Sequence, residues 1–217
     1  MNFSNEEYVK NLEYVEALFT LGGLSECGKS SAGKYLDTLG IKRQKIIKIE
    51  REMMEDIGFD LSNGIKNEYF VELYKYNQEQ VFREFLFRLI EKMKKEKITK
   101  VSIESLYRAP LGEFLKRELG DRVANIYIEA PIEIRAYRQM LKVNKEAEAE
   151  GKCKITLEEM LEKVKENDLF KEKHHAKDVI NIADYIVDNS DKVSYDEFLK
   201  QITYIAEKTI NTRKIKS

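Results

Sequence analysis

Short apolar segments rich in β-branched residues alternate along this chain with longer segments that have the apolar spacing of helices. This alternation favours an α/β fold, in which parallel strands form a sheet and helices cover both of its faces. The strand candidates are nearly continuously apolar, as expected where both faces of a sheet are covered. Five strands are predicted, at 17–23, 45–50, 100–105, 124–130 and 184–189.

The segments between these strands predict helices, because their apolar residues recur with helical periodicity. Helices are predicted at 29–40, 68–97, 109–119, 131–150, 156–170, 170–183 and 194–210. Two connections are too long for simple crossovers, so we expect one domain with a core and two helical additions. The core is predicted at 17–50, 98–135 and 183–210, with a flap at 51–97 and a lid at 136–180.

Composition limits the partners of the chain. Its 217 residues are 42% hydrophobic, which suffices for the core of one domain. A net charge of −1 and a pI of about 6.3 give no basic excess for binding nucleic acid, which is not an expected partner. The chain has two cysteines, a polar and acidic start, and no apolar run of roughly 20 residues. We expect a cytoplasmic protein without a membrane partner.

Residues 23–30 lie between the first predicted strand and the first predicted helix, and they match G-x-x-x-x-G-K-[ST] at every fixed position. Glycines let backbone N–H groups converge on phosphate oxygens where a side chain would block the approach. The start of the helix adds the positive end of its dipole. An ordinary turn would not need this placement, so the motif predicts a phosphate-binding loop. The predicted nucleotide-binding residues are Gly23, Leu24, Ser25, Glu26, Cys27, Gly28, Lys29, Ser30 and Ser31.

Three of these residues have distinct expected roles. Lys29 is expected to reach the β- and γ-phosphates, and the Ser30 hydroxyl is expected to ligate Mg²⁺. Cys27 is interpreted as a small loop residue whose backbone amide matters more than its thiol, with redox sensing as the alternative.

Polar residues stand at the ends of the other predicted strands, where ligands of open α/β sheets bind. The second strand ends at Glu50, and the third ends at Glu104 and is followed by Arg108. A glutamate that ends an apolar strand is hard to explain as surface decoration, which favours a functional Glu104. For Glu50 a solvated position is equally compatible. Arg108 is a candidate clamp for a substrate phosphate, and Asn189 ends the fifth strand.

Arg135 and Arg138 are three positions apart and share one face of the predicted lid helix. Cations at this place could lie over a transferring phosphoryl group, and solvated surface charges are the alternative. His174 and His175 have no metal-ligand companions at regular spacing, so they are interpreted as ordinary polar residues of a helix.

With these motifs the chain resembles the small P-loop kinases of nucleosides, nucleotides and related metabolites. The resemblance is nearest to the dephospho-CoA kinase and deoxynucleoside monophosphate kinase branch. It covers residues 17 to about 206, is specific at the P-loop, and extends to IYIEAPIEIRAYRQM (126–140) and NIADYIVDNSDKVSYDEFLKQI (181–202). The resemblance implies a three-layer P-loop NTPase fold with a five-stranded parallel sheet, and ATP and Mg²⁺ as cofactors.

Carried onto matching positions, the resemblance implies that the charge of Lys29 is essential and that Arg138, with Arg135, stabilises the transferring phosphoryl group. Asn189 would pass along the adenine. Glu50 falls where dephospho-CoA kinases have an aspartate after the second strand.

Glu104 falls near the acidic position of the family after the third strand, and Arg108 falls near a substrate-binding arginine of phage-type nucleotide kinases. Because both acidic positions hold glutamate at equivalent strand ends, the sequence does not decide between Glu50 and Glu104 as the residue that orients the acceptor or the metal ion.

The expected function is an ATP- and Mg²⁺-dependent phosphotransferase that moves the γ-phosphate to a small nucleotide- or nucleoside-like acceptor. A dephospho-CoA-type metabolite kinase is the alternative. The alternative from another class is an ATP-binding regulatory NTPase without a small-molecule acceptor. Because the flap at 51–97 matches no acceptor-specific pattern, the identity of the acceptor is left open. The sequence also leaves open the choice between ATP and GTP and whether the protein forms a homodimer.

Overall fold

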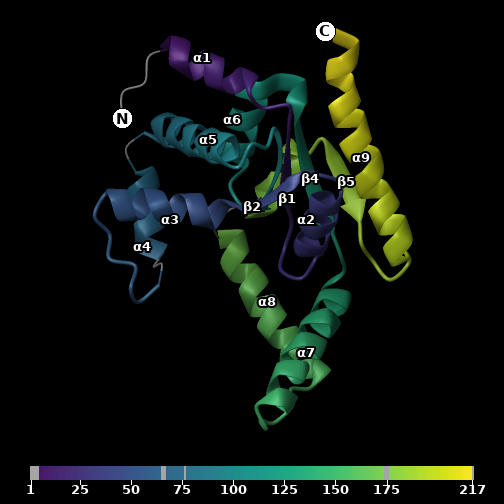
Figure 1. The fold of residues 1–217 in the computed structure, drawn as a ribbon. Helices are drawn as coiled ribbons and strands as arrows, with labels where there is room; N and C mark the ends of the chain where they lie inside the picture. The colour runs from purple at the N-terminus through teal and green to yellow at the C-terminus, as the bar shows by residue number, and fades with distance from the viewer. Residues whose placement is uncertain (1–4, 65–66, 76, 174–175, 217) are drawn as a thin grey trace.

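The computed structural model describes residues 5–64, 67–75, 77–173 and 176–216. At its centre is a sheet of parallel strands in the order β2-β3-β1-β4-β5, with helices on both faces (Figure 1). The predicted α/β architecture is confirmed. The strands are β1 (Ala17–Gly22), β2 (Lys42–Lys45), β3 (Lys100–Leu106), β4 (Val123–Glu129) and β5 (Tyr185–Asp188).

Helices make up most of the remaining described residues. The α-helices are α1 (Asn5–Glu13), α2 (Lys29–Thr38), α3 (Ile46–Asp56), α4 (Asn67–Tyr74), α5 (Gln78–Lys95), α6 (Ala109–Leu119), α7 (Ile132–Ala149), α8 (Leu157–Lys173) and α9 (Tyr195–Lys216). Short 3₁₀ helices are η1 (Gly120–Arg122) and η2 (Ala176–Ile182).

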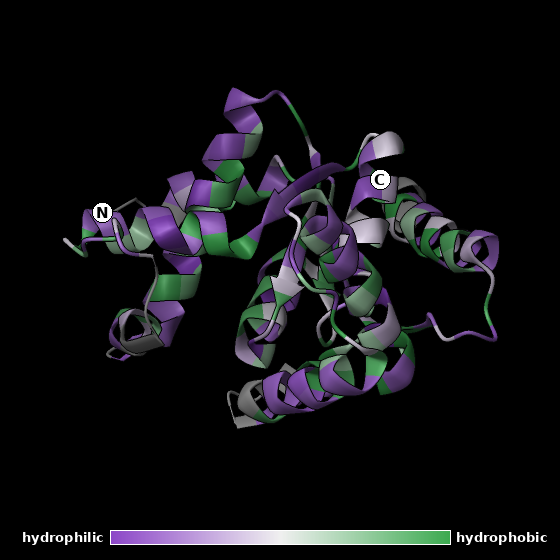
Figure 2. Ribbon diagram, turned by 90° about the horizontal axis from the view of Figure 1, so that it is seen from below, coloured by the Kyte–Doolittle hydropathy of each residue, from purple (hydrophilic) through white to green (hydrophobic). Residues whose placement is uncertain are grey.

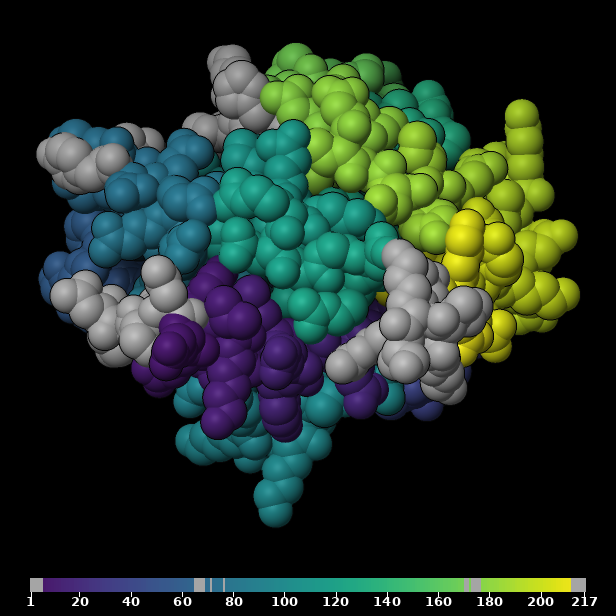
Figure 3. All heavy atoms as spheres, turned by 90° about the horizontal axis from the view of Figure 1, so that it is seen from above, coloured from purple at the N-terminus to yellow at the C-terminus, as the bar shows by residue number. Residues whose placement is uncertain are grey.

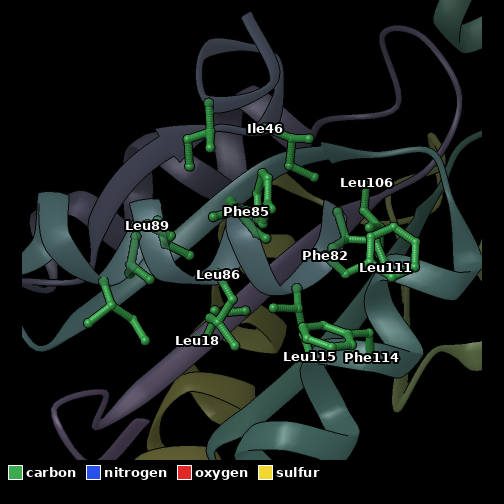
Figure 4. Packing of buried hydrophobic residues seen from close by; sticks show 14 of the residues in the cluster. Leu18, Ile46, Phe82, Phe85, Leu86, Leu89, Leu106, Leu111, Phe114 and Leu115 are labelled. Carbon is green, nitrogen blue, oxygen red and sulfur yellow. The ribbon is translucent and has the colours of Figure 1, made fainter. Parts of the chain in front are cut away.

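The hydrophobic core lies on both faces of the sheet, because successive residues of a strand point to opposite faces. Leu18 of β1 joins a cluster with α3, α5 and α6, in which Phe85 and Leu86 are fully buried (Figure 4). Phe19 and Leu21 join a second cluster with α2 and α9. The helices that cover the sheet carry both hydrophobic and hydrophilic residues (Figure 2). β1 is buried along its whole length, so the glycine loop that follows it has a rigid base.

The N-terminal helix α1 packs beside the first cluster, at the end of the sheet opposite the glycine loop. It is the purple segment that lies against the teal residues in Figure 3. The Tyr8 hydroxyl donates to the Glu118 carboxylate of α6 at 3.0 Å. Helix α1 is therefore attached to the core but takes no part in the loop side of the sheet.

Helices α7 and α8 lie side by side and extend beyond the sheet (Figure 1). They share a small hydrophobic cluster of their own, formed around Ala136, Met160 and Val164. The helical lid expected at 136–180 corresponds to this pair and to η2, and His174 and His175 lie outside the described residues.

The prediction for the second strand was wrong. The strand is the polar edge segment Lys42–Lys45, and helix α3 begins at Ile46. The buried residues of 46–54 follow helical spacing: Ile46, Ile49, Glu50, Met53 and Met54. Edge strands are commonly short and charged, so β2 had no apolar signature, and the isoleucines beside it belong to a helix.

The prediction of one continuous helix at 68–97 was also wrong. Helix α4 ends at Tyr74, and a separate helix, α5, begins at Gln78. The Asn77 side chain caps the second helix by accepting from the Gln80 N–H at 3.1 Å. Asparagine is a common N-cap residue, so Asn77 marked the start of a new helix in the sequence. The helix predicted at 170–183 is also not one element, because η2 covers only 176–182 of it.

No helix within the described ranges is both long and apolar enough to cross a bilayer. Both cysteines are free, Cys27 buried in the glycine loop and Cys153 exposed after α7.

Candidate functional site

The glycine loop, residues 23–28, connects the end of β1 to the start of α2 as the motif predicted. Gly23 and Gly28 have φ values of 125° and 117°, which only glycine adopts readily. A Cβ on Gly23 would clash with the backbone oxygen of Ile128, and one on Gly28 would clash with the amide of Asn189. Both glycines are therefore required by the backbone and by close neighbours.

The side chain of Lys29 folds back over this loop from the first residue of α2. Its ammonium donates to the Gly23 carbonyl at 2.8 Å and to the Leu24 carbonyl at 2.5 Å, and lies 3.5 Å from the Cys27 sulfur. The charge is thus held at the centre of the loop, where phosphate oxygens could replace the two carbonyls as acceptors from the ammonium.

Asn189, which follows β5, joins the glycine loop to helix α7. Its side-chain N–H donates to the Cys27 carbonyl at 2.7 Å, and its backbone carbonyl accepts from Nη2 of Arg138 at 3.1 Å. The Nη1 of Arg138 is buried without a hydrogen-bond partner, and burial lowers the pKa of this guanidinium. A buried donor without a hydrogen-bond partner is costly in free energy, and an anionic ligand could supply that partner beside the loop.

Glu104 lies at the end of β3 and is almost completely buried. Both of its carboxylate oxygens accept from Arg43 of β2, through Nε to one and through Nη2 to the other at 2.8 Å. The Ser30 hydroxyl donates to Oε2 at 3.4 Å, and Gly33 of α2 packs against the carboxylate. Glu104 therefore lies beside Ser30, the predicted metal ligand.

Glu50 is also completely buried, but in α3 and not at a strand end. Its Oε1 accepts from the hydroxyls of Tyr74 and Tyr107, each at 2.6 Å, and its Oε2 has no hydrogen-bond partner. Burial raises the pKa of this carboxyl, whereas the two hydroxyls and the nearby charge of Arg108 act in the opposite direction.

Arg108 stacks on the two tyrosines that hold Glu50. Its guanidinium carbon lies 4.1 Å from the centre of the Tyr74 ring and 5.1 Å from that of Tyr107. Its Nε is buried without a partner, and no carboxylate within the described ranges forms an ion pair with it. A cavity of about 200 Å³ opens beside it, lined by Tyr74, Gln78, Phe82, Arg108, Ala109, Pro110 and Asp178.

Arg135 is buried and joins the lid to the glycine loop. Its terminal nitrogens donate to both oxygens of Asp168 in α8, one at 3.0 Å and one at 2.5 Å. The Nη1 also donates to the carbonyl of Ser25 at 3.4 Å. Arg135 is thus engaged by protein groups, whereas Arg138 keeps one donor unpaired.

The sequence pattern did not single out Arg43, Asp168 or the two tyrosines that bind Glu50. Arg43 lies in a polar strand and Asp168 in the middle of a charged helix, where charges are ordinary. Tyr74 is buried like a core residue, but its hydroxyl donates to a carboxylate. These partners are brought together by the sheet and the helix packing, and no local spacing encodes them.

The loop fits a nucleotide phosphate chain, since the Lys29 ammonium lies at its centre and Arg138 adds an unpaired donor beside it. Within the described ranges no three or more His, Cys, Asp or Glu side chains are grouped so that they could hold a metal ion. A magnesium ion here would therefore use the Ser30 hydroxyl together with phosphate oxygens and water, which is its usual coordination in such sites.

No family model matches the chain, and no curated protein is similar to it at a significant level. Solved structures are similar. An uncharacterized protein from Eubacterium ventriosum has 13% identity and a TM-score of 0.53, over 88% of this chain and 99% of that one. The protein TT1252 from Thermus thermophilus has 14% identity and a TM-score of 0.51, over 88% and 95% of the two chains.

Kinases of small molecules are also among the similar structures. Dephospho-CoA kinase from Campylobacter jejuni has 16% identity and a TM-score of 0.39, over 88% of this chain and 96% of that one. The strand order, the covered sheet and the glycine loop between β1 and α2 define the three-layer P-loop NTPase fold.

Proposed function

We propose that this protein is an ATP- and Mg²⁺-dependent phosphotransferase that moves the γ-phosphate of ATP to a small nucleotide- or nucleoside-like acceptor. The observation that carries the proposal is the connection made by Asn189. It binds the loop at Cys27 and the lid helix at Arg138, so a lid arginine with an unpaired donor stands over the phosphate loop. A binding loop alone needs no such cation, whereas phosphoryl transfer needs charge neutralisation.

On the donor side, bound ATP with Mg²⁺ supplies the phosphoryl group and most of the charge neutralisation. Lys29 exchanges the Gly23 and Leu24 carbonyls for phosphate oxygens, and Ser30 offers its hydroxyl to the metal ion. Arg138 directs its unpaired Nη1 at the developing charge. Arg135, bound to Asp168 and to Ser25, supports the loop from the lid.

On the acceptor side, the cavity beside Arg108 has the aromatic walls Tyr74 and Phe82, which suit a ring. The unpaired Nε of Arg108 suits an anionic group on the same molecule. Glu50 lies behind the tyrosines, so its role is to hold Tyr74 and Tyr107 under Arg108.

The test is transfer of label from γ-labelled ATP to a panel of nucleosides, nucleoside monophosphates and dephospho-CoA. Lys29→Ala should abolish transfer, because it removes the charge at the centre of the loop. Lys34→Ala is the matched control, since Lys34 is an exposed residue of the same helix, and it should leave transfer unchanged.

Stoichiometric transfer to a nucleotide or nucleoside supports the proposal. Transfer to dephospho-CoA alone would replace the acceptor class with that of a coenzyme precursor. Acceptor-independent release of ADP, or nucleotide binding without turnover, would instead indicate a regulatory NTPase and would reject the phosphotransferase.

A further inference from the structure

We propose that Arg43 is a positioning residue for the metal end of the nucleotide site. Arg43 holds Glu104, and Glu104 holds the hydroxyl of Ser30 in the orientation that a metal ion needs. The inference rests on the proposed function, which supplies the magnesium–nucleotide complex. It assigns a role to Arg43, a residue of the polar edge strand β2.

The pairing of Arg43 with Glu104 follows from the sheet. β2 runs parallel to β3, with Arg43 opposite Ser102 and Lys45 opposite Glu104. The guanidinium reaches along the sheet and donates to both carboxylate oxygens, the two-pronged geometry in which arginine is strongest. The Glu104 side chain is 2% exposed and that of Arg43 is 25% exposed, so the pair is shielded mainly on the carboxylate side.

The bonding of Glu104 leaves it no open oxygen. Oε2 accepts from Arg43 and from Ser30, at 2.8 and 3.4 Å. Oε1 accepts from Arg43 and faces Gly33, where even a Cβ would clash with it. In this arrangement a metal ion cannot bind Glu104 directly, so the carboxylate acts through Ser30.

The contact of Ser30 with Glu104, at 3.4 Å, gives the hydroxyl proton an acceptor in the carboxylate. A hydroxyl has one proton and two acceptor lone pairs, and donating to Glu104 leaves the lone pairs for a cation. In the described part of the chain, Arg43 is the one cation within ion-pairing distance of Glu104. Arg43 is itself anchored, because its backbone N–H donates to Asp37 of α2 at 3.2 Å. Without its guanidinium, the buried carboxylate would lose both its orientation and its counter-charge.

The test measures binding of a fluorescent ATP analogue in Mg²⁺ and in EDTA, and takes the ratio of the two affinities as the metal benefit. For Arg43→Met we expect the metal benefit to fall by about 10- to 100-fold, the usual loss when a residue supporting a metal ligand is removed. Affinity in EDTA should stay the same, because the glycine loop is intact. Arg43→Lys, which keeps one donor and the charge, should retain part of the benefit.

The matched control is Arg51→Met, which removes an exposed pair with Glu55 in α3 and should change neither affinity. An unchanged metal benefit in Arg43→Met would overturn the inference. An equal loss of affinity in Mg²⁺ and in EDTA would also overturn it, because that result indicates general damage to the loop.

The same measurements separate this inference from the proposed function. Wild-type protein that binds the nucleotide with a metal benefit but transfers phosphate to no acceptor would reject the phosphotransferase and leave the role of Arg43 standing. Wild-type protein without any metal benefit would reject both.

Discussion

Two glutamates are buried near the carboxyl ends of the strands, and their surroundings differ in kind. Glu104 is held by a charged partner and a hydroxyl, Arg43 and Ser30, which together engage both of its oxygens. Glu50 is held by two tyrosine hydroxyls on one oxygen and has nothing on the other. The first site is an ion pair with an arginine. The second is an aromatic site in which burial favours the protonated form.

The comparison shows that burial alone does not assign a role to a carboxylate. In the sequence both glutamates seemed to end strands, and the choice between them was open. In the structure Glu104 lies beside the glycine loop, whereas Glu50 lies behind the two tyrosines on which Arg108 stacks. Substitution of Glu104 should therefore change mainly the free energy of unfolding, whereas substitution of Glu50 should change mainly how that free energy depends on pH.

The largest effect on stability should come from Glu104→Gln, because it leaves Arg43 without its counter-charge. Breaking a buried ion pair costs about 3–5 kcal/mol, and partial exposure of Arg43 places the expected loss near the lower end, at about 3 kcal/mol. Urea unfolding followed by far-UV circular dichroism measures it, since the chain has no tryptophan. A loss below about 1 kcal/mol would mean that the pair is no stronger than an exposed one.

An intermediate effect is expected for Tyr74→Phe and for Tyr107→Phe, each of which removes one donor to Glu50 and keeps the ring under Arg108. Each substitution should lower the free energy of unfolding by about 1–2 kcal/mol. Because both hydroxyls bind the same oxygen, the double variant should deviate from the sum of the single ones. Strict additivity would show that the two hydrogen bonds are independent.

The smallest effect at neutral pH is expected for Glu50→Gln, within about 1 kcal/mol of wild type, because an amide keeps the shape and can still accept from the tyrosines. The pH dependence gives the sharper test. The folded-state pKa of Glu50 is raised above its usual 4.5, so the unfolded chain loses this proton first as pH rises.

The contribution of Glu50 to stability is therefore largest below pH 4.5 and decreases as pH rises toward its folded-state pKa. Glu50→Gln lacks this decrease, so its stability relative to wild type should increase as pH rises above 4.5 toward the folded-state pKa of Glu50. Equal pH profiles for the two proteins would show that Glu50 keeps an ordinary pKa.

The sequence predicted the place of the glycine loop in the fold much better than the surroundings of Glu50 and Arg108, for a physical reason. The glycine loop is contiguous and its spacing is dictated by the phosphates, so GLSECGKS is sufficient to place Lys29 and Ser30. Four strands were also placed correctly, because buried parallel strands are nearly continuously apolar. The second strand was missed because the apolar residues at 46–54 belong to a helix.

The partners of both glutamates come from distant parts of the chain. Arg43 and Glu104 are 61 positions apart, and Glu50 and Tyr107 are 57 positions apart. Strand register and the position of the flap bring them together, and neither has a local sequence signature. The roles of Arg108 and Arg138 remain proposals that rest on their unpaired donors.

The contact between Asn189 and the glycine loop has a consequence for the order of folding. The two groups of this hydrogen bond, the Asn189 amide and the Cys27 carbonyl, are 162 positions apart. During synthesis from the N-terminus, the glycine loop leaves the ribosome long before β5, which must dock beside β4 to carry Asn189 into place. Contacts of such sequence separation form late because they require a large loop to close. A nascent chain can therefore contain the complete phosphate motif for most of its synthesis without a finished phosphate site.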